Sequence, residues 1–179
     1  MVDPEYAVIQ AIASGDRAAF ELLVKRYQSP VCNFVYRYLG DRAAAEDITQ
    51  EVLLRVYRSA SRFDPKGRVS SWVFQIARNL SLNEIKRRGR ARLSETELKD
   101  EREYTSAKSP VASEAHALEH EVMAALGELP ENQRAALLWR VNEGLSYREI
   151  GEVLGVSVQS VESLIFRARE RLRSSLRRK

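Results

Sequence analysis

Polar side chains near the C-terminal end recur at a spacing suited to chemistry on one face of a helix. Gln159, Ser163 and Arg167 follow one another at intervals of four residues, which places them on a single helix face. Amide and guanidinium groups bond to base edges in a DNA groove, whereas additional arginines neutralise phosphates. The chemistry expected here is therefore recognition of nucleic acid. The candidate residues are Ser157, Gln159, Ser160, Ser163, Phe166, Arg167 and Arg169.

The sequence around this face, YREIGEVLGVSVQSVESLIFRARERL, has the spacing of a helix-turn-helix. Gly151 allows two helices to approach closely, and Gly155 suits the left-handed conformation of a tight turn. Ser146 and Glu149 form a capping box for the first helix, and Ser157 can cap the second. The alternative is a helical hairpin whose terminal arginines are merely solvated. The buried stripe of the second helix is expected at Val161, Leu164, Ile165, Ala168 and Leu172.

Residues 70–88 predict another helix, which is apolar around most of its circumference and crossed by a narrow polar track. Aromatic rings, amides and a basic end suit the capture of unpaired bases, because bases stack on rings, bond to amides and leave their phosphates beside cations. Packing in a core explains Trp72 and Phe74 equally well. The candidate residues are Trp72, Gln75, Asn79, Asn83, Lys86, Arg87 and Arg88.

A third polar stripe lies on the helix expected at residues 42–60 and contains a leucine among charged residues. Charges supply register at a protein interface and an apolar centre supplies buried area, so this pattern is typical of a partner site. An ordinary solvated face with one exposed leucine is the alternative. The stripe consists of Asp47, Gln50, Glu51, Leu54 and Arg58.

One pair of side chains has metal-binding spacing, and it favours an enzyme only weakly. His116 and His120 lie four residues apart, as two ligands on one helix face would. No third ligand has an obvious spacing, and the sequence is not the HExxH arrangement used for hydrolysis. Cys32 is the only cysteine, which excludes an internal disulfide and a cysteine-rich metal site. We therefore expect no catalytic residues, no metal and no cofactor.

The elements that position these residues are all predicted to be helices, because apolar residues recur at three and four and glycine and proline are sparse. An amphipathic helix is expected over residues 16–39, with Pro30 kinking or splitting it. Gly40 should end this helix and Asp41 should cap the next one.

The periodicity lapses after the helix at residues 70–88 and returns near Leu118. The fold class expected is therefore all-α, with two small helical domains joined by a flexible acidic linker. The predicted parts are a domain at residues 1–90, the linker at 91–113 and a helix-turn-helix domain at 114–179.

The single cysteine, Cys32, and the lack of a secretory signal predict a cytoplasmic protein. The chain has 179 residues, of which 44% are hydrophobic and 30% charged, and its net charge is +4, which allows packed cores and argues against disorder. Residues 1–10 lack the basic start and apolar run of a secretory signal. No apolar run approaches the length needed to span a membrane, so no membrane insertion is expected.

Taken together, the three motifs resemble those of the extracytoplasmic-function (ECF) sigma factors of bacterial RNA polymerase. AAAEDITQEVLLRVYRS from Ala43 is similar to the family's polymerase-binding helix, and SSWVFQIARNLSLNEIKRR from Ser70 is similar to its minus-10 reading helix. The motif from Tyr147 is similar to its minus-35 reader, and the order and separation of the three also match.

This resemblance implies a sigma factor that directs core RNA polymerase to specific promoters and assists promoter melting. The implied partners are the clamp helices of the polymerase's largest subunit, promoter DNA and an anti-sigma factor. Asn79 would hold a minus-10 base turned out of the stack. Glu162 and Leu164 depart from the family pattern, in which many members carry arginine, which puts phosphate contacts there in doubt. The competing function is a helix-turn-helix transcriptional regulator that does not bind core polymerase.

Overall fold

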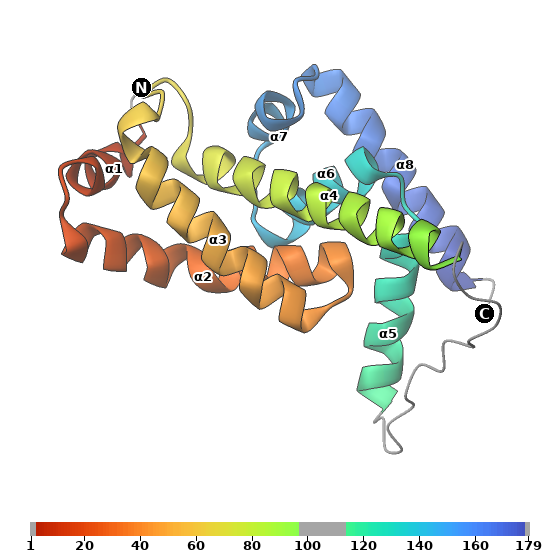
Figure 1. The fold of residues 1–179 in the computed structure, drawn as a ribbon. Coiled ribbons are helices and arrows are strands. Elements are labelled where there is room, and N and C mark those ends of the chain that lie inside the picture. The colour runs from red at the N-terminus through yellow and green to blue at the C-terminus, as the bar shows by residue number, and fades with distance from the viewer. Residues whose placement is uncertain (1–2, 97–113, 178–179) are drawn as a thin grey trace.

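The computed structural model describes residues 3–96 and 114–177, and every regular element in these ranges is a helix. The all-α prediction is confirmed. Figure 1 shows two groups of helices, an N-terminal one and a C-terminal one, packed side by side. The elements are α1 (Tyr6–Ala13), α2 (Arg17–Leu39), α3 (Arg42–Ser59), the short 3-10 helix η1 (Ala60–Arg62), α4 (Val69–Thr96), α5 (Glu114–Gly127), α6 (Glu131–Asn142), α7 (Tyr147–Leu154) and α8 (Val158–Arg177).

The N-terminal group is built on the α2–α3 hairpin, with α4 packed against both helices. Gly40 ends α2 in the left-handed conformation with a φ of 73°, and the Asp41 side chain accepts a hydrogen bond from the Ala44 amide at 3.0 Å. Both features were predicted. Pro30 lies inside α2, but it does not split the helix.

The C-terminal group contains the predicted helix-turn-helix, formed by α7 and α8. Ser146 and Glu149 form the capping box, and Gly155 has a φ of 67°. A Cβ atom on Gly151 would lie 2.8 Å from the Val156 carbonyl oxygen, so this position requires glycine. Ser157 accepts a hydrogen bond from the Ser160 amide at 3.2 Å, as expected of a cap.

Helix α4 is longer than predicted. It continues to Thr96, whereas the sequence predicted a helix end near Arg88 and a linker from residue 91. Residues 91–96 are therefore helical, because they contain neither proline nor glycine and follow an established helix whose backbone bonds they can extend. The rest of the predicted linker, residues 97–113, lies outside the described residues.

The two groups share a continuous buried surface, which was not predicted. Helix α6 packs on α2 and α7 packs on α4. Phe34 of α2 and Trp139 of α6 are both fully buried at this contact, and one cluster of buried apolar side chains runs through both groups. The two helical regions are thus docked onto each other, and the candidate faces of α3, α4 and α8 belong to one body.

Candidate nucleic-acid interface

The predicted reading face of α8 is exposed. Gln159, Ser163 and Arg167 face solvent, as do Ser157, Ser160 and Arg169, and Phe166 is 66% exposed. The predicted buried stripe packs beneath them, with Val161, Ile165 and Ala168 fully buried and Leu164 and Leu172 half-buried against the core. Leu164 therefore serves packing, whereas Glu162 is exposed.

The start of α4 lines a cleft of about 180 Å³. Trp72 is half-buried there, with its ring centroid 5.0 Å from that of Phe63, and Gln75 is exposed. The turn at residues 63–68 supplies one wall, so the cleft joins an aromatic ring, an amide and a guanidinium group. None of the residues of this turn was predicted from the sequence to be a site residue. The run Asp64-Pro65-Lys66-Gly67 is nevertheless typical of a turn. The lining residues are Phe63, Asp64, Gly67, Arg68, Ser71, Trp72 and Gln75, with Glu152 and Val153 of α7.

Further along α4, the predicted polar track is exposed at Asn79, Asn83 and Lys86. The two arginines at the basic end of the track already have carboxylate partners. The Arg87 guanidinium donates two hydrogen bonds to Glu84, each of 2.8 Å, and Arg88 donates to Glu84 at 2.7 Å and to Asp41 at 2.8 Å.

Of these charge-assisted bonds, the one from Arg88 to Asp41 joins two elements of the N-terminal group, and the others lie within α4. Hydrogen bonds from Arg87 and Arg88 lower the pKa of Glu84 to about 2. The pKa of Asp41 is lowered as well, first by the Ala44 amide and then by Arg88. Since Asp41 caps α3, Arg88 ties α4 to the beginning of the helix that carries the third candidate face.

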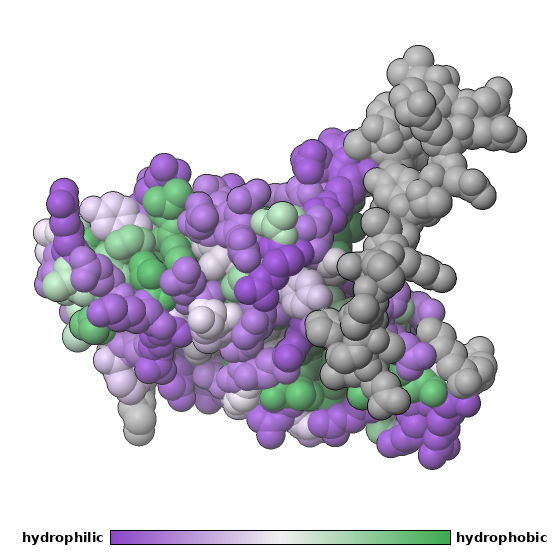
Figure 2. Space-filling model, turned by 90° about the horizontal axis from the view of Figure 1, so that it is seen from below, coloured by the Kyte–Doolittle hydropathy of each residue, from purple (hydrophilic) through white to green (hydrophobic). Residues whose placement is uncertain are grey.

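That third face, on α3, is also accessible. Asp47, Gln50 and Arg58 are exposed, and Leu54 is 43% exposed among them. Glu51 is half-buried and pairs with Arg55 at 2.7 Å. Figure 2 shows a mainly hydrophilic surface on which hydrophobic side chains gather in small groups.

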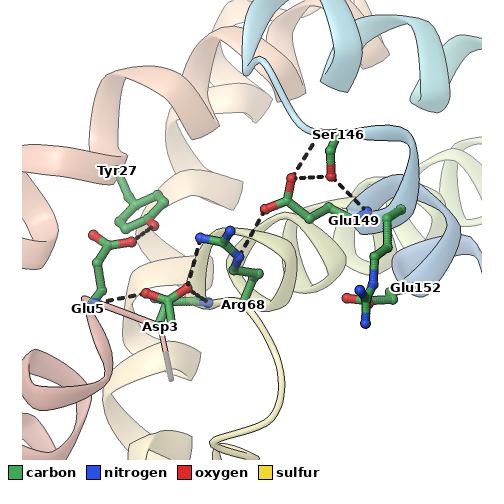
Figure 3. A network of polar contacts seen from close by, with 9 residues as sticks. Asp3, Glu5, Tyr27, Arg68, Ser146, Glu149 and Glu152 are labelled. Atoms are coloured by element: carbon green, nitrogen blue, oxygen red, sulfur yellow. Dashed lines mark hydrogen bonds and ion pairs between the residues drawn. The ribbon is translucent and has the colours of Figure 1, made fainter. Parts of the chain in front are cut away.

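A polar network joins the start of α4 to both regions (Figure 3). The buried Asp3 carboxylate accepts hydrogen bonds from the Glu5 amide at 2.7 Å and from the Val69 amide at 3.1 Å. The Arg68 guanidinium lies 4.0 Å from Asp3 and 3.5 Å from Glu149 of the α7 capping box. Arg68 thus connects the N-terminal turn to the helix-turn-helix.

The histidine pair gains no further ligand in the described part of the chain. His120 is exposed on α5, whereas the side chain of His116 lies outside the described residues. Among the described residues, no group of three histidine, cysteine, aspartate or glutamate side chains could hold a metal ion. The helices that the structure describes also include none with the length and apolar character of a membrane span.

Comparison with known proteins assigns both helical regions. Residues 23–91 match the family described as Sigma-70 region 2, and residues 119–172 match Sigma-70, region 4. The chain is 32% identical over 183 residues to the ECF RNA polymerase sigma-E factor of Haemophilus influenzae, covering 96% of this chain and 95% of that protein. The chain belongs to the ECF sigma factors.

Other similarities agree with this assignment. The sigma factor is 38% identical over 170 residues to the ECF RNA polymerase sigma factor SigE of Mycolicibacterium smegmatis, covering 92% of this chain and 65% of that longer protein. Its fold is similar to that of CnrH, solved in complex with the cytosolic domain of CnrY, with a TM-score of 0.76, 23% identity and 99% of each chain covered. The sigma factor RpoE of Bartonella quintana, solved with the anti-sigma factor NepR, gives a TM-score of 0.70 at 22% identity, covering 88% of this chain and 96% of that one.

Proposed function

We propose that this sigma factor brings core RNA polymerase to promoters with three separate faces. The α3 face, formed by Asp47, Gln50, Glu51, Leu54 and Arg58, docks on the clamp helices of the largest subunit. The α4 cleft and polar track take the melted minus-10 strand, and the α8 face reads the minus-35 major groove. No bond is made or broken, because binding energy for the opened strand shifts the duplex equilibrium.

The observation that carries this proposal is the cleft at the start of α4. It brings the half-buried ring of Trp72, the amide of Gln75 and the exposed guanidinium of Arg68 to one place. Stacking on a ring, bonding to an amide and pairing with a cation are the interactions by which proteins bind single-stranded nucleic acid. A regulator that binds only duplex DNA has no use for such a cleft.

The proposed N-terminal unit, residues 1–90, binds polymerase and the minus-10 element, and α4 extends it to residue 96. The proposed C-terminal unit, residues 114–179, binds the minus-35 element. The linker at 91–113, shortened to 97–113 by that helix, joins them. We also propose that the protein acts in the cytoplasm, where polymerase is found, and that an anti-sigma factor masks it. The CnrY and NepR complexes of the two proteins of similar fold support such a partner.

In vitro transcription with core polymerase on a promoter library tests this function. Asn79→Ala should impair open-complex formation while leaving binding to core polymerase unchanged, because Asn79 is exposed on α4 and lies outside the α3 face. Failure of the wild-type protein to select start sites, or to bind core polymerase at any ratio, would favour the regulator instead.

A further inference from the structure

One buried carboxylate contacts the start of α4, where the cleft lies. Asp3, which precedes α1, is 8% exposed, and it lies outside residues 23–91, which match Sigma-70 region 2. We propose that Asp3 is a positioning residue for minus-10 binding, because it holds the first turn of α4 and the Arg68 guanidinium in the arrangement that receives a phosphate of the opened strand. This inference rests on the proposed role of the α4 cleft.

The two oxygens of this carboxylate bind the beginnings of two helices. Oδ1 accepts a hydrogen bond from the amide of Glu5, the residue before α1, at 2.7 Å, and Oδ2 accepts one from the amide of Val69, the first residue of α4, at 3.1 Å. Amides at the beginning of a helix have no partner within the helix. Arg68, which immediately precedes α4, cannot supply one, because its side chain has no acceptor atom. Asp3 therefore caps α4 from 66 residues away.

The same Oδ2 atom lies near the side chain of Arg68. It is 4.0 Å from Nη1 of Arg68, whose side chain is 57% exposed, whereas the side chain of Asp3 is only 4% exposed. A guanidinium presents several donors in a fixed fork, so Arg68 can stay beside a buried anion and still bind a phosphate from the solvent side. Glu149 approaches the guanidinium too, at 3.5 Å, but Asp3 also holds the backbone of α4. Figure 3 shows these contacts around Arg68.

Asp3 is itself held in place through its neighbour Glu5. The Tyr27 hydroxyl donates a hydrogen bond to Glu5 at 2.6 Å, and Arg26 pairs with Glu5 at 2.6 Å. Both partners belong to α2. Residues near a chain terminus are poorly ordered unless they are tied down, so this attachment lets Asp3 set the position of the cleft relative to the α2–α3 hairpin.

The contacts of Asp3 require a carboxylate. An asparagine side chain has one acceptor oxygen and one NH2 group, so at this position it would direct a donor at one of the two amides and lose its charge toward Arg68. Removing a negative charge also makes the protein more attractive to DNA in general. A variant of Asp3 that engages DNA less well would therefore act against the general effect of its charge.

Holoenzyme reconstituted from the full chain and core polymerase tests the role of Asp3 on a promoter that the wild type selects from a library. A fluorescent base analogue in the minus-10 element follows strand opening, and a titration gives the affinity for core polymerase. Asp3→Asn should slow opening about tenfold, as loss of a charge-assisted contact does, and leave the affinity for core within about twofold. Asp3→Ala should act alike, and it places no donor beside the amides if Asp3→Asn disrupts folding.

A double-mutant cycle separates positioning from general stability. Arg68→Ala should also slow opening about tenfold, and adding Asp3→Asn should change little more, because both substitutions remove the same contact. Asp16→Asn is the matched control, since Asp16 caps α2 through the amides of Ala18 and Ala19. It makes the same change in charge and should leave opening within about twofold of wild type.

The possible results lead to different conclusions. Multiplicative effects of the Asp3 and Arg68 substitutions, or an equal loss of affinity for core polymerase, would mean that Asp3 only stabilises the fold, and would overturn its positioning role. Faster opening with Asp3→Asn would mean that Asp3 restrains Arg68, with the same consequence. If Arg68→Ala is slow and both Asp3 variants open normally, only the positioning role is wrong. If Arg68→Ala opens the promoter as the wild type does, the proposed role of the cleft is wrong as well.

Discussion

The indole of Trp139 in α6 stacks on the ring of Phe34 in α2, with centroids 5.5 Å apart and planes inclined by 14°. Both side chains are fully buried, so each region completes its core with a residue of the other. Aromatic pairs of this kind contribute beyond their buried area. The two regions are therefore expected to unfold together while docked, although each matches a sigma factor region of its own.

The exposed leucine of the α3 face is the first target for mutation. Leu54→Ala should weaken binding to core polymerase by about tenfold or more, as loss of an apolar anchor at the centre of an interface does. Leu22→Ala is the matched control, because Leu22 is 60% exposed on α2 and lies outside the α3 face. Fluorescence titration with core polymerase measures both, and an equal effect of the two substitutions would remove the assignment of the α3 face.

Arg167→Ala on α8 should weaken binding to a minus-35 duplex and make it less sensitive to salt. Arg167 is exposed beside Gln159 and Ser163. If it neutralises one phosphate, the slope of log affinity against log salt should fall by about one. A salt titration with duplex DNA measures this slope; an unchanged slope with lower affinity would instead indicate a contact to a base.

The stability of the docked form should depend on Glu143, which caps α6. Burial raises the pKa of Glu143 to about 7, and the charge of Arg37 offsets this only in part. Because the folded form holds this proton more tightly than the unfolded chain, the contribution of Glu143 to stability is present below pH 4.5 and is lost as the pH rises through about 7.

Urea denaturation of Glu143→Gln checks this sign. The variant should match the wild type near the acidic end of the range and be more stable above neutral pH, since glutamine carries no charge to bury. Parallel pH profiles for the two proteins would show that Glu143 does not titrate on unfolding.

Replacing each of two glycines by alanine should change the stability of the fold in opposite directions. Gly151→Ala brings a Cβ atom to 2.8 Å from a backbone oxygen and should cost about 1–3 kcal/mol, as overpacking does. Gly89 lies inside α4 with nothing within 4 Å of its Cβ position, so Gly89→Ala should stabilise by about 0.5–1 kcal/mol. The midpoints of urea denaturation measure both changes in stability. If Gly151→Ala left the stability unchanged, α7 and α8 would have to be able to move apart.

Local signals explain what the sequence could predict. The helix-turn-helix follows from a capping box, a left-handed Gly155 and an apolar stripe, all within about 30 residues of one another. The docking of the regions depends on contacts such as Arg134 with Tyr38, 96 residues apart, which periodicity does not reveal. The cleft was predicted only in part, because one of its walls is the turn at residues 63–68, whose position depends on tertiary packing. For the same reason, the pairing of Arg88 with Asp41 was not foreseen.

The bond between Asp3 and the Val69 amide links residues 66 positions apart, and this has a consequence for synthesis on the ribosome. Domains generally fold as their chains emerge, and α1, α2 and α3 leave the exit tunnel before α4 does. The Asp3 carboxylate can accept its hydrogen bond from the Val69 amide only after Val69 has emerged. Forming this bond then closes a long loop, which adds an entropic cost. The nascent chain thus exposes α3, which carries the proposed polymerase-docking face, before α4, which carries the proposed minus-10 face, is anchored.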